Sequence, residues 1–245
     1  MKSQAIFFDF VNTLSDPGSD YLAHRTFLRQ HLPVADISDG ELEQLHQHYE
    51  VYFEADYHKT LSGGPFISLC ECHALAFKRL VQKDLPPALG RQLTKEQIDW
   101  GAGFMEQHIR YCTLYPEALP VVQACRQAGF YVGLISDYDD YPLRVILSKT
   151  GLLTELDSIT TSEEVRSYKP GVKIFQAALD KAGLSALQAI YVGDRWERDV
   201  AGAKKMGMTA ILVGDETPGN PPPDLHLGHI RELPAMLTSL LVKPS

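Results

Sequence analysis

The sequence predicts an α/β fold, in which helices cover a parallel β-sheet and a helical domain is inserted near the N-terminus. From about residue 115 onward, short apolar strand patterns alternate with helix patterns, as in parallel sheets that are covered on both faces. Between residues 16 and 113 only helix patterns are clear. The 245 residues suffice for such a core with a smaller insertion.

The predicted sheet begins with the apolar run AIFFD at residues 5–9, which ends at the carboxylate of Asp9. After residue 115 the apolar periodicity indicates an alternating series of strands and helices. We expect strands at 130–136, 157–160, 189–194 and 209–214, and helices at 116–129, 141–149, 172–183, 196–207 and 231–241. The stretch PGNPPPD at 218–224 is expected to be a loop, since three consecutive prolines exclude a helix.

The inserted region has helix patterns at residues 40–58, 67–83 and 95–111, with SGGP at 62–65 as an interruption. A helical block between the first strand and the rest of the sheet is interpreted as a cap. We therefore expect a core made of residues 1–15 and 114–245 and a helical cap at 16–113.

Composition limits the partners and the location. Lys and Arg together number 23 and Asp and Glu 31, which gives a net charge of −8. This balance argues against a nucleic-acid surface and against attraction to anionic membranes. The sequence has no apolar run of about 18 residues that could span a bilayer and no leader pattern after Met1, so a cytoplasmic protein is expected. The oligomeric state has no signal in the sequence.

The pair His46 and His48 is interpreted as part of a surface helix rather than as a metal site. Positions two apart on a helix point in different directions, so the two imidazoles would not share an ion.

Polar residues gather where the predicted strands end. In an open parallel sheet, ligands bind outside the carboxyl ends of the strands. Each of the acids and Ser136 alone has an ordinary interpretation as a helix cap, helix N-terminal charge or turn residue. Lys169 is harder to explain in this way, because a cation at a helix N-terminus opposes the helix dipole. Their occurrence together, at the same edge of the sheet, favours a functional site. The residues at these positions are Asp9, Ser136, Asp137, Lys169, Asp194 and Asp199.

Charge predicts a cation at this edge. Asp9, Asp194 and Asp199 place three carboxylates near one ammonium, that of Lys169, which leaves roughly two negative charges uncompensated. Mg²⁺ would cancel that charge, and carboxylate oxygens are the ligands it prefers. The hydroxyl of Ser136 and the ammonium of Lys169 are suited to holding a phosphate.

Four ordered motifs resemble those of the haloacid dehalogenase superfamily, most of whose members are phosphatases that form an aspartyl-phosphate. They are DFVNTL (9–14), LIS (134–136), YKPGVKIF (168–175) and GDRWERDVAGA (193–203). The resemblance implies a Rossmann-like core with a helical cap inserted directly after the first motif.

The resemblance also implies a role for each matching residue. Asp9 would be the nucleophile and a Mg²⁺ ligand, and the main-chain carbonyl of Val11 a second ligand. Asp194 and Asp199 would complete the metal site. Ser136 and Lys169 would orient the phosphate and stabilise charge in the transition state. Thr13 would position the loop around Asp9, and Thr13 and Asp137 are counted with the substrate-binding residues.

Val11 departs from the family pattern, because phosphatases of this family place an aspartate there as acid and base. Loss of such a group costs about 10²–10⁴ in rate. The missing acid and base would come from the cap, from the substrate or from water. Candidates in the sequence are Asp16 and the pair His58 and Lys59.

The sequence thus predicts a Mg²⁺-dependent phosphatase that acts on a small phosphorylated compound. One alternative is a degenerate member that binds a phosphorylated ligand or a protein partner. Another is a dehalogenase or a phosphonate-cleaving enzyme. The family's dehalogenases work without a metal, so Asp194 and Asp199 disfavour that activity, and Lys59 is a candidate for a phosphonatase Schiff base only by its place in the cap.

Overall fold

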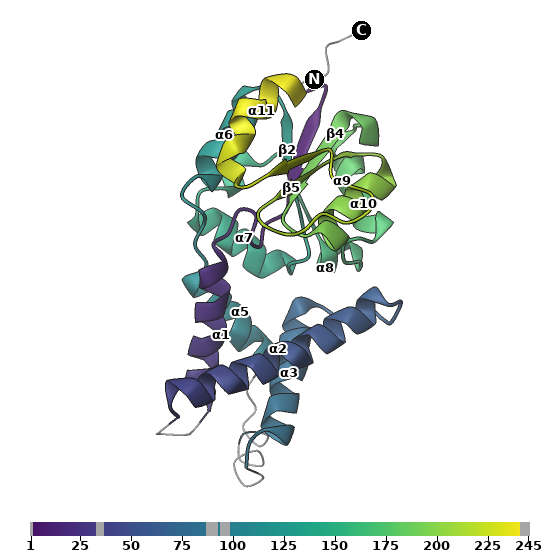
Figure 1. Cartoon of the computed structure of the whole chain (residues 1–245). Coiled ribbons are helices and arrows are strands. Elements are labelled where there is room, and N and C mark those ends of the chain that lie inside the picture. The colour runs from purple at the N-terminus through teal and green to yellow at the C-terminus, as the bar shows by residue number, and fades with distance from the viewer. Residues whose placement is uncertain (1, 33–36, 87–92, 94–98, 241–245) are drawn as a thin grey trace. The chain divides into compact units, whose positions relative to one another are not determined.

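The computed structural model describes residues 2–32, 37–86, 93 and 99–240 (Figure 1). Residues 95–98 and 241, which belong to two of the predicted helices, lie outside this set. The chain divides into two compact units. The core unit comprises Met1–Pro17 and Thr113–Ser245, and the helical unit comprises Gly18–Cys112.

The core unit is built on a six-stranded sheet with the strand order β3-β2-β1-β4-β5-β6. Every neighbouring pair is parallel, so the predicted α/β fold class is confirmed. The strands are β1 (Ala5–Phe8), β2 (Tyr131–Ser136), β3 (Ser158–Thr161), β4 (Ala189–Gly193), β5 (Thr209–Val213) and β6 (Leu225–Leu227).

The register of the central strands determines which residues meet at the carboxyl edge. Phe8 at the end of β1 pairs with Leu134 of β2 on one side and with Val192 of β4 on the other. Asp9, Ser136 and Asp194 therefore leave three adjacent strands at the same edge.

Helices cover both faces of this sheet, α6 and α11 on one and α9 and α10 on the other (Figure 1). The helices of the core unit are α6 (Ala118–Gln127), α7 (Asp140–Lys149), α8 (Ser162–Val165), α9 (Val172–Ala182), α10 (Ala201–Met206) and α11 (Leu233–Leu240). Short turns of 3-10 helix are η1 (Leu153–Glu155), η2 (Ala186–Gln188) and η4 (Ile230–Glu232).

Three elements of the core unit differ from the expectation. The predicted helix at 196–207 begins as a π-helix, η3 (Trp196–Val200), and only then continues as α10. The short helix α8 and the edge strand β6 were not predicted. The strand β6 directly follows the proline-rich segment, and its three residues are too few to show a period.

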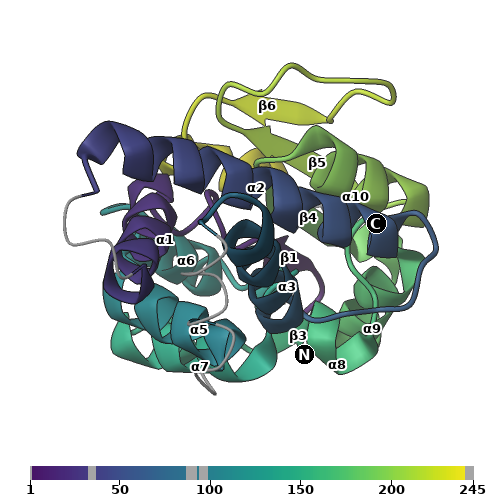
Figure 2. The same cartoon turned by 90° about the horizontal axis from the view of Figure 1, so that it is seen from below.

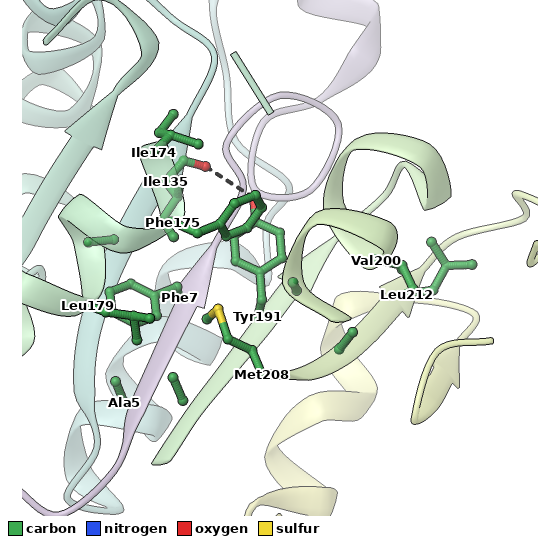
Figure 3. Close-up of a cluster of buried hydrophobic side chains, with 14 residues drawn as sticks. Ala5, Phe7, Ile135, Ile174, Phe175, Leu179, Tyr191, Val200, Met208 and Leu212 are labelled. Atoms are coloured by element: carbon green, nitrogen blue, oxygen red, sulfur yellow. Dashed lines mark hydrogen bonds between the residues drawn. The ribbon is translucent and has the colours of Figure 1, made fainter. Parts of the chain in front are cut away.

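Apolar side chains from β1, β2, β4, β5, α9 and α10 form one buried cluster between the sheet and these two helices (Figure 3). The ring of Tyr191 lies in this cluster, edge-on to Phe175 at a centroid distance of 5.3 Å. Burial of a side chain of this size stabilises the fold by about 1.5–3 kcal/mol. The core thus supports directly the residues that project from its edge.

The helical unit contains α1 (Pro17–His31), α2 (Asp39–Leu61), α3 (Leu69–Lys83) and α5 (Trp100–Tyr111), with α3 packed against both α2 and α5 (Figure 2). Ser38 with Glu41 and Ser68 with Glu71 form capping boxes at the starts of α2 and α3. Phe27, Phe77 and Phe104 are among the residues of its apolar core.

The histidine pair on α2 is only partly as expected. His48 is exposed, but His46 is buried at 8% exposure, so its assignment to a surface position was wrong. The other helices of the unit cover the face of α2 that carries His46. Such burial depends on tertiary contacts, which the sequence around a histidine does not reveal. None of the described helices combines the length and the apolar character that a membrane crossing requires.

Candidate active site

Asp9 stands at the end of the fully buried strand β1 and is itself only 6% exposed. Its main-chain N–H donates to the carbonyl of Val192 at 2.8 Å, so the adjacent strand fixes its place. The chain then turns sharply, with Asn12 in the left-handed region at φ 59°. Asparagine tolerates that conformation better than most residues, which suits it to the turn after the acid.

The ammonium of Lys169 bridges two of the predicted carboxylates. It lies 2.7 Å from Oδ1 of Asp9 and 2.7 Å from Oδ1 of Asp199, and the side chain is 2% exposed. Asp137 holds the segment that carries this lysine, because its carboxylate accepts the main-chain N–H of Lys169 at 2.8 Å. In this structure Asp137 therefore supports the position of Lys169.

Asp199 is fully buried inside the π-helix η3. Its Oδ2 accepts the main-chain N–H of Arg195 at 2.9 Å. A Cβ atom on Gly193 would approach the carboxyl carbon of Asp199 to 2.4 Å, so only glycine at position 193 leaves room for this carboxylate.

Asp194 leaves β4 one residue after that glycine and is oriented by Thr13. The Thr13 hydroxyl donates to Oδ1 of Asp194 at 3.1 Å, and Thr13 is completely buried. The first motif and the acidic motif, far apart in the sequence, are thereby joined directly.

Sequence reasoning missed Tyr191, which lies within β4 among apolar neighbours. Its hydroxyl is 3.0 Å from the Lys169 ammonium and 3.1 Å from Oδ1 of Asp199. The same hydroxyl is 3.2 Å from the carbonyl oxygen of Ile135 (Figure 3). Tyrosine is common in strands, so its residue type alone gave no signal.

Ser136 ends β2 and is 1% exposed. Its hydroxyl oxygen accepts the main-chain N–H of Tyr138 at 3.3 Å. The register places it at the same edge as Asp9. Val11 is half-buried in the loop that follows Asp9.

The three candidates for a replacement acid or base lie in different units. Asp16 belongs to the core unit, where its main-chain N–H donates to the carbonyl of Thr113 at 2.9 Å. His58 and Lys59 are exposed near the C-terminal end of α2, and His58 pairs with Glu54 at 3.2 Å.

The site holds more negative charge than Lys169 can balance. Burial raises the pKa of Asp9 well above its usual value, although the charge of Lys169 opposes the shift. Burial and the neighbouring charge of Asp199 raise the pKa of Asp194 to about 6. Burial disfavours the charged form of Lys169, but Asp199 and Asp9 outweigh it and raise its pKa above the usual range. Lys169 therefore stays positively charged, whereas burial disfavours the ionised forms of Asp9 and Asp194.

The donor set fits a hard divalent cation. One oxygen from each of Asp9, Asp194 and Asp199 lies within 4.8 Å of the others. The raised pKa values of Asp9 and Asp194 are those expected where a positive charge is lacking beside clustered carboxylates. Oxygen-only ligands of this kind favour Mg²⁺ over softer metals.

A cavity of about 420 Å³ opens beside Asp194 on the β5 side of the core unit. Its wall includes Thr13, Tyr115, Arg195, Glu216 and His229. Tyr115 and His229 face each other edge-on at a centroid distance of 5.3 Å. Apart from Thr13 and Asp194, none of the predicted site residues is part of this wall, and Tyr115, Glu216 and His229 lie outside the four motifs.

Comparison with known proteins identifies the family. The model of the family described as haloacid dehalogenase-like hydrolase matches residues 78–213. The haloacid dehalogenase-like hydrolase domain-containing protein 3 of Danio rerio is 32% identical over 192 residues, which cover 66% of this chain and 78% of that protein. The chain therefore belongs to the haloacid dehalogenase-like hydrolases, as the four motifs predicted.

Relatives with named activities match shorter stretches. A glyceraldehyde 3-phosphate phosphatase of Methanopyrus kandleri is 30% identical over 130 residues, which cover 50% of this chain and 56% of that protein. The (S)-2-haloacid dehalogenase 4A of Burkholderia cepacia is 30% identical over 109 residues, which cover 44% and 46%.

Solved structures agree on the fold. The putative HAD-hydrolase YfnB from Bacillus subtilis, in a magnesium-bound crystal structure, superposes with a TM-score of 0.78 at 17% identity. The match covers 97% of this chain and all of that one. At this identity the likeness shows the fold alone.

Proposed function

We propose that this hydrolase is a Mg²⁺-dependent phosphatase that acts on a small phosphorylated compound through an aspartyl-phosphate on Asp9. The observation that carries the proposal is the buried cluster at the sheet edge, in which Lys169 touches Asp9 and Asp199 and a third carboxylate, Asp194, lies nearby. The named phosphatase among the relatives supports the same reaction class.

In the first half of the proposed reaction, a carboxylate oxygen of Asp9 attacks the phosphorus atom of the substrate. The bond between phosphorus and the leaving oxygen breaks, and the leaving oxygen takes up a proton. In the second half, water attacks the phosphorus of the aspartyl-phosphate, the bond to Asp9 breaks, and inorganic phosphate leaves. Asp9 must be ionised to begin this sequence.

Asp9, Asp194, Asp199 and the main-chain carbonyl of Val11 would hold the Mg²⁺ ion. Once bound, the ion would supply positive charge that favours the ionised forms of Asp9 and Asp194 and offsets the charge of the phosphate. Lys169 would keep Asp9 oriented and, with the Ser136 hydroxyl, bind the phosphoryl oxygens as negative charge develops. Thr13, Asp137 and Tyr191 would hold Asp194 and Lys169 in place.

Proton transfer to the leaving group is the step with no assigned residue, because Val11 cannot perform it. We propose that the enzyme prefers acyl or aryl phosphates, whose leaving groups need little protonation. The helical unit would serve as the cap that selects the substrate and excludes water.

The dehalogenase among the relatives makes carbon–halogen cleavage the second candidate. That reaction has no need for the acidic pair Asp194 and Asp199, whereas the structure brings both into the cluster with Asp9. A binding protein without turnover has equally little need for a buried lysine beside a nucleophile.

The test is hydrolysis of an aryl phosphate by the purified chain, with and without Mg²⁺, in the wild type and in Asp9→Asn. Asp180→Asn, which changes an exposed carboxylate on α9, is the matched control. We expect metal-dependent phosphate release by the wild type and the control and only background from Asp9→Asn. Mass spectrometry of acid-quenched enzyme should locate a phosphoryl adduct on the peptide that contains Asp9.

Two outcomes would reject the proposal. Release of halide from a 2-haloacid in the presence of a chelator, without phosphate release from an aryl or an acyl phosphate, would assign the chain to the dehalogenases. Tight binding of a phosphate ester with no turnover in any metal would assign it to the binding proteins.

A further inference from the structure

The helical unit contains a buried histidine cluster that the proposed phosphatase reaction does not use. Its members come from four helices: His24 from α1, His46 from α2, His73 from α3 and His108 from α5. None is more than 9% exposed. Four buried imidazoles are unusual in a small helical unit, since histidine is only intermediate in its tendency to be buried.

Three of these side chains converge on one point. His24, His73 and His108 each offer a ring nitrogen, and these nitrogens lie within 4.8 Å of one another. Nε2 of His24 and Nε2 of His108 are 2.9 Å apart. Three imidazoles that face one another in this way are a common ligand set for zinc.

The opposite ring nitrogens face oxygen atoms. Nδ1 of His24 is 2.7 Å from Oε1 of Glu50, and Nδ1 of His108 is 3.5 Å from Oδ1 of Asp20. Nδ1 of His73 contacts the hydroxyl of Tyr49. In metal centres a ligating histidine almost always donates its second N–H to a carboxylate or another oxygen, which orients the ring. All three histidines have such a partner.

The fourth histidine contacts the same network. Nε2 of His46 is 3.3 Å from Oε1 of Glu50 and 3.4 Å from Nδ1 of His24. Glu50 thus lies beside the imidazoles of both His24 and His46.

A cation between the Nε2 atoms of His24 and His108 is compatible with these contacts, because the Nδ1–H group of each ring can then donate to the carboxylate beside it.

We propose that His24, His73 and His108 bind a first-row transition-metal dication, for which Zn²⁺ is the probe, and that Glu50, Asp20 and Tyr49 orient these ligands. Zinc–nitrogen bonds of about 2.0–2.1 Å at tetrahedral angles separate ligand nitrogens by about 3.3 Å. The 2.9 Å between the Nε2 atoms therefore has to widen by only a few tenths of an ångström. The ion would join α1, α3 and α5.

This site differs in chemistry from the carboxylate cluster in the core unit. Imidazole nitrogens select zinc, cobalt, nickel or copper, whereas carboxylate oxygens select magnesium. The same protein would therefore hold two different ions in two separate units. The histidine site rests on its own contacts and is independent of the phosphatase proposal.

The test uses the full chain, purified without a histidine tag, stripped with a chelator and titrated with Co²⁺ and then Zn²⁺. We expect one Co²⁺ per chain with the strong visible absorption of a tetrahedral site in which three imidazole nitrogens and one water bind the ion, and its displacement by Zn²⁺. Zn²⁺ should also raise Tm, because the ion binds only the folded state. His73→Gln and His108→Gln should abolish both signals.

Matched variants separate the two sites. His58→Gln changes an exposed histidine on α2 that also pairs with a carboxylate, and it should bind Co²⁺ like the wild type. Asp9→Asn should keep the Co²⁺ absorption, because it alters only the carboxylate cluster. Glu50→Gln should weaken Zn²⁺ binding about 10–100-fold, as expected when a residue that orients a metal ligand is changed.

The proposal is overturned if the wild type shows no saturable Co²⁺ absorption, if both histidine variants retain it, or if Asp9→Asn loses it. Circular dichroism of each variant establishes that it is folded. If a histidine variant does not fold, Glu50→Gln decides, since this side chain is 38% exposed and its replacement leaves the core intact. Unchanged Zn²⁺ affinity in folded Glu50→Gln would then reject the site.

Discussion

The ammonium of Lys169 lies 2.7 Å from Oδ1 of Asp9, so the proposed nucleophile is already paired with a cation before any substrate arrives. The same ammonium also contacts Asp199. One buried positive charge thus restrains two acids that would otherwise repel each other.

Replacement of Lys169 by methionine should destabilise the fold by about 3–5 kcal/mol, because it leaves buried carboxylates without their cation. Urea denaturation in the presence of a chelator measures this loss. Lys173→Met, an exposed position on α9, is the control and should lie within about 0.5 kcal/mol of the wild type. Equal midpoints for the two variants would show that Lys169 is not needed to balance the acids.

The pKa of Asp194 predicts a pH-dependent stability in the absence of metal. Since the pKa rises from 3.8 to about 6 on folding, the folded state binds more protons than the unfolded state between these values. The contribution of Asp194 to stability therefore falls as the pH rises through this window.

Melting curves of the wild type and Asp194→Asn from pH 4 to pH 8, in a chelator, test this sign. The difference between the Tm of the variant and the Tm of the wild type should increase up to about pH 6 and then stay constant. Saturating Mg²⁺ should raise the wild type more than the variant. If this difference in Tm decreases with rising pH, the raised pKa of Asp194 is contradicted.

Tyr191→Phe removes one hydroxyl and keeps the ring that packs against Phe175. We expect a loss of about 1–3 kcal/mol in the free energy of unfolding, because Lys169 and Asp199 lose a buried partner. Phosphatase turnover should also fall, since the lysine is less well held. Tyr131→Phe on β2, whose hydroxyl makes an exposed contact with the carbonyl of Lys181, is the control. Equal effects of the two variants would remove Tyr191 from the site.

Val11→Asp should raise the turnover of alkyl phosphates by up to about 10²–10⁴, because it restores a group that can protonate the leaving oxygen. Val11→Asn has nearly the same shape without the acid and should give no gain. Aryl phosphates should respond much less, as their leaving groups need little protonation. No gain on any ester would show that another residue already supplies the proton.

The central strands and the polar residues at their edge could be predicted because β1, β2 and β4 are apolar runs that end at or just before a charged or hydroxyl residue. Asp9, Ser136 and Asp194 were found from this pattern alone. Tyr191 could not be found in this way, since a tyrosine inside an apolar strand has no pattern that distinguishes a polar contact from packing.

Other features depend on tertiary contacts. Asp199 lies in a π-helix and approaches Gly193 too closely for a Cβ atom, and a helix period in the sequence reveals neither feature. The burial of His46 and its neighbours depends on four helices from separate parts of the chain. Sequence spacing within one helix therefore gave the wrong environment for His46.

The segment that leaves the core unit before α1 and the segment that returns to it after α5 are paired with each other. Ser15 and Leu114 form an antiparallel bridge, and Asp16 donates to the carbonyl of Thr113. All four residues belong to the core unit, and the strands of the sheet come from this unit without any residue of Gly18–Cys112. Such a junction permits modular exchange, since an insertion of another length or shape can be grafted at this point without re-routing a strand. Under the proposed function, in which this insert selects the substrate, its replacement would change specificity while the residues at the sheet edge stay in place.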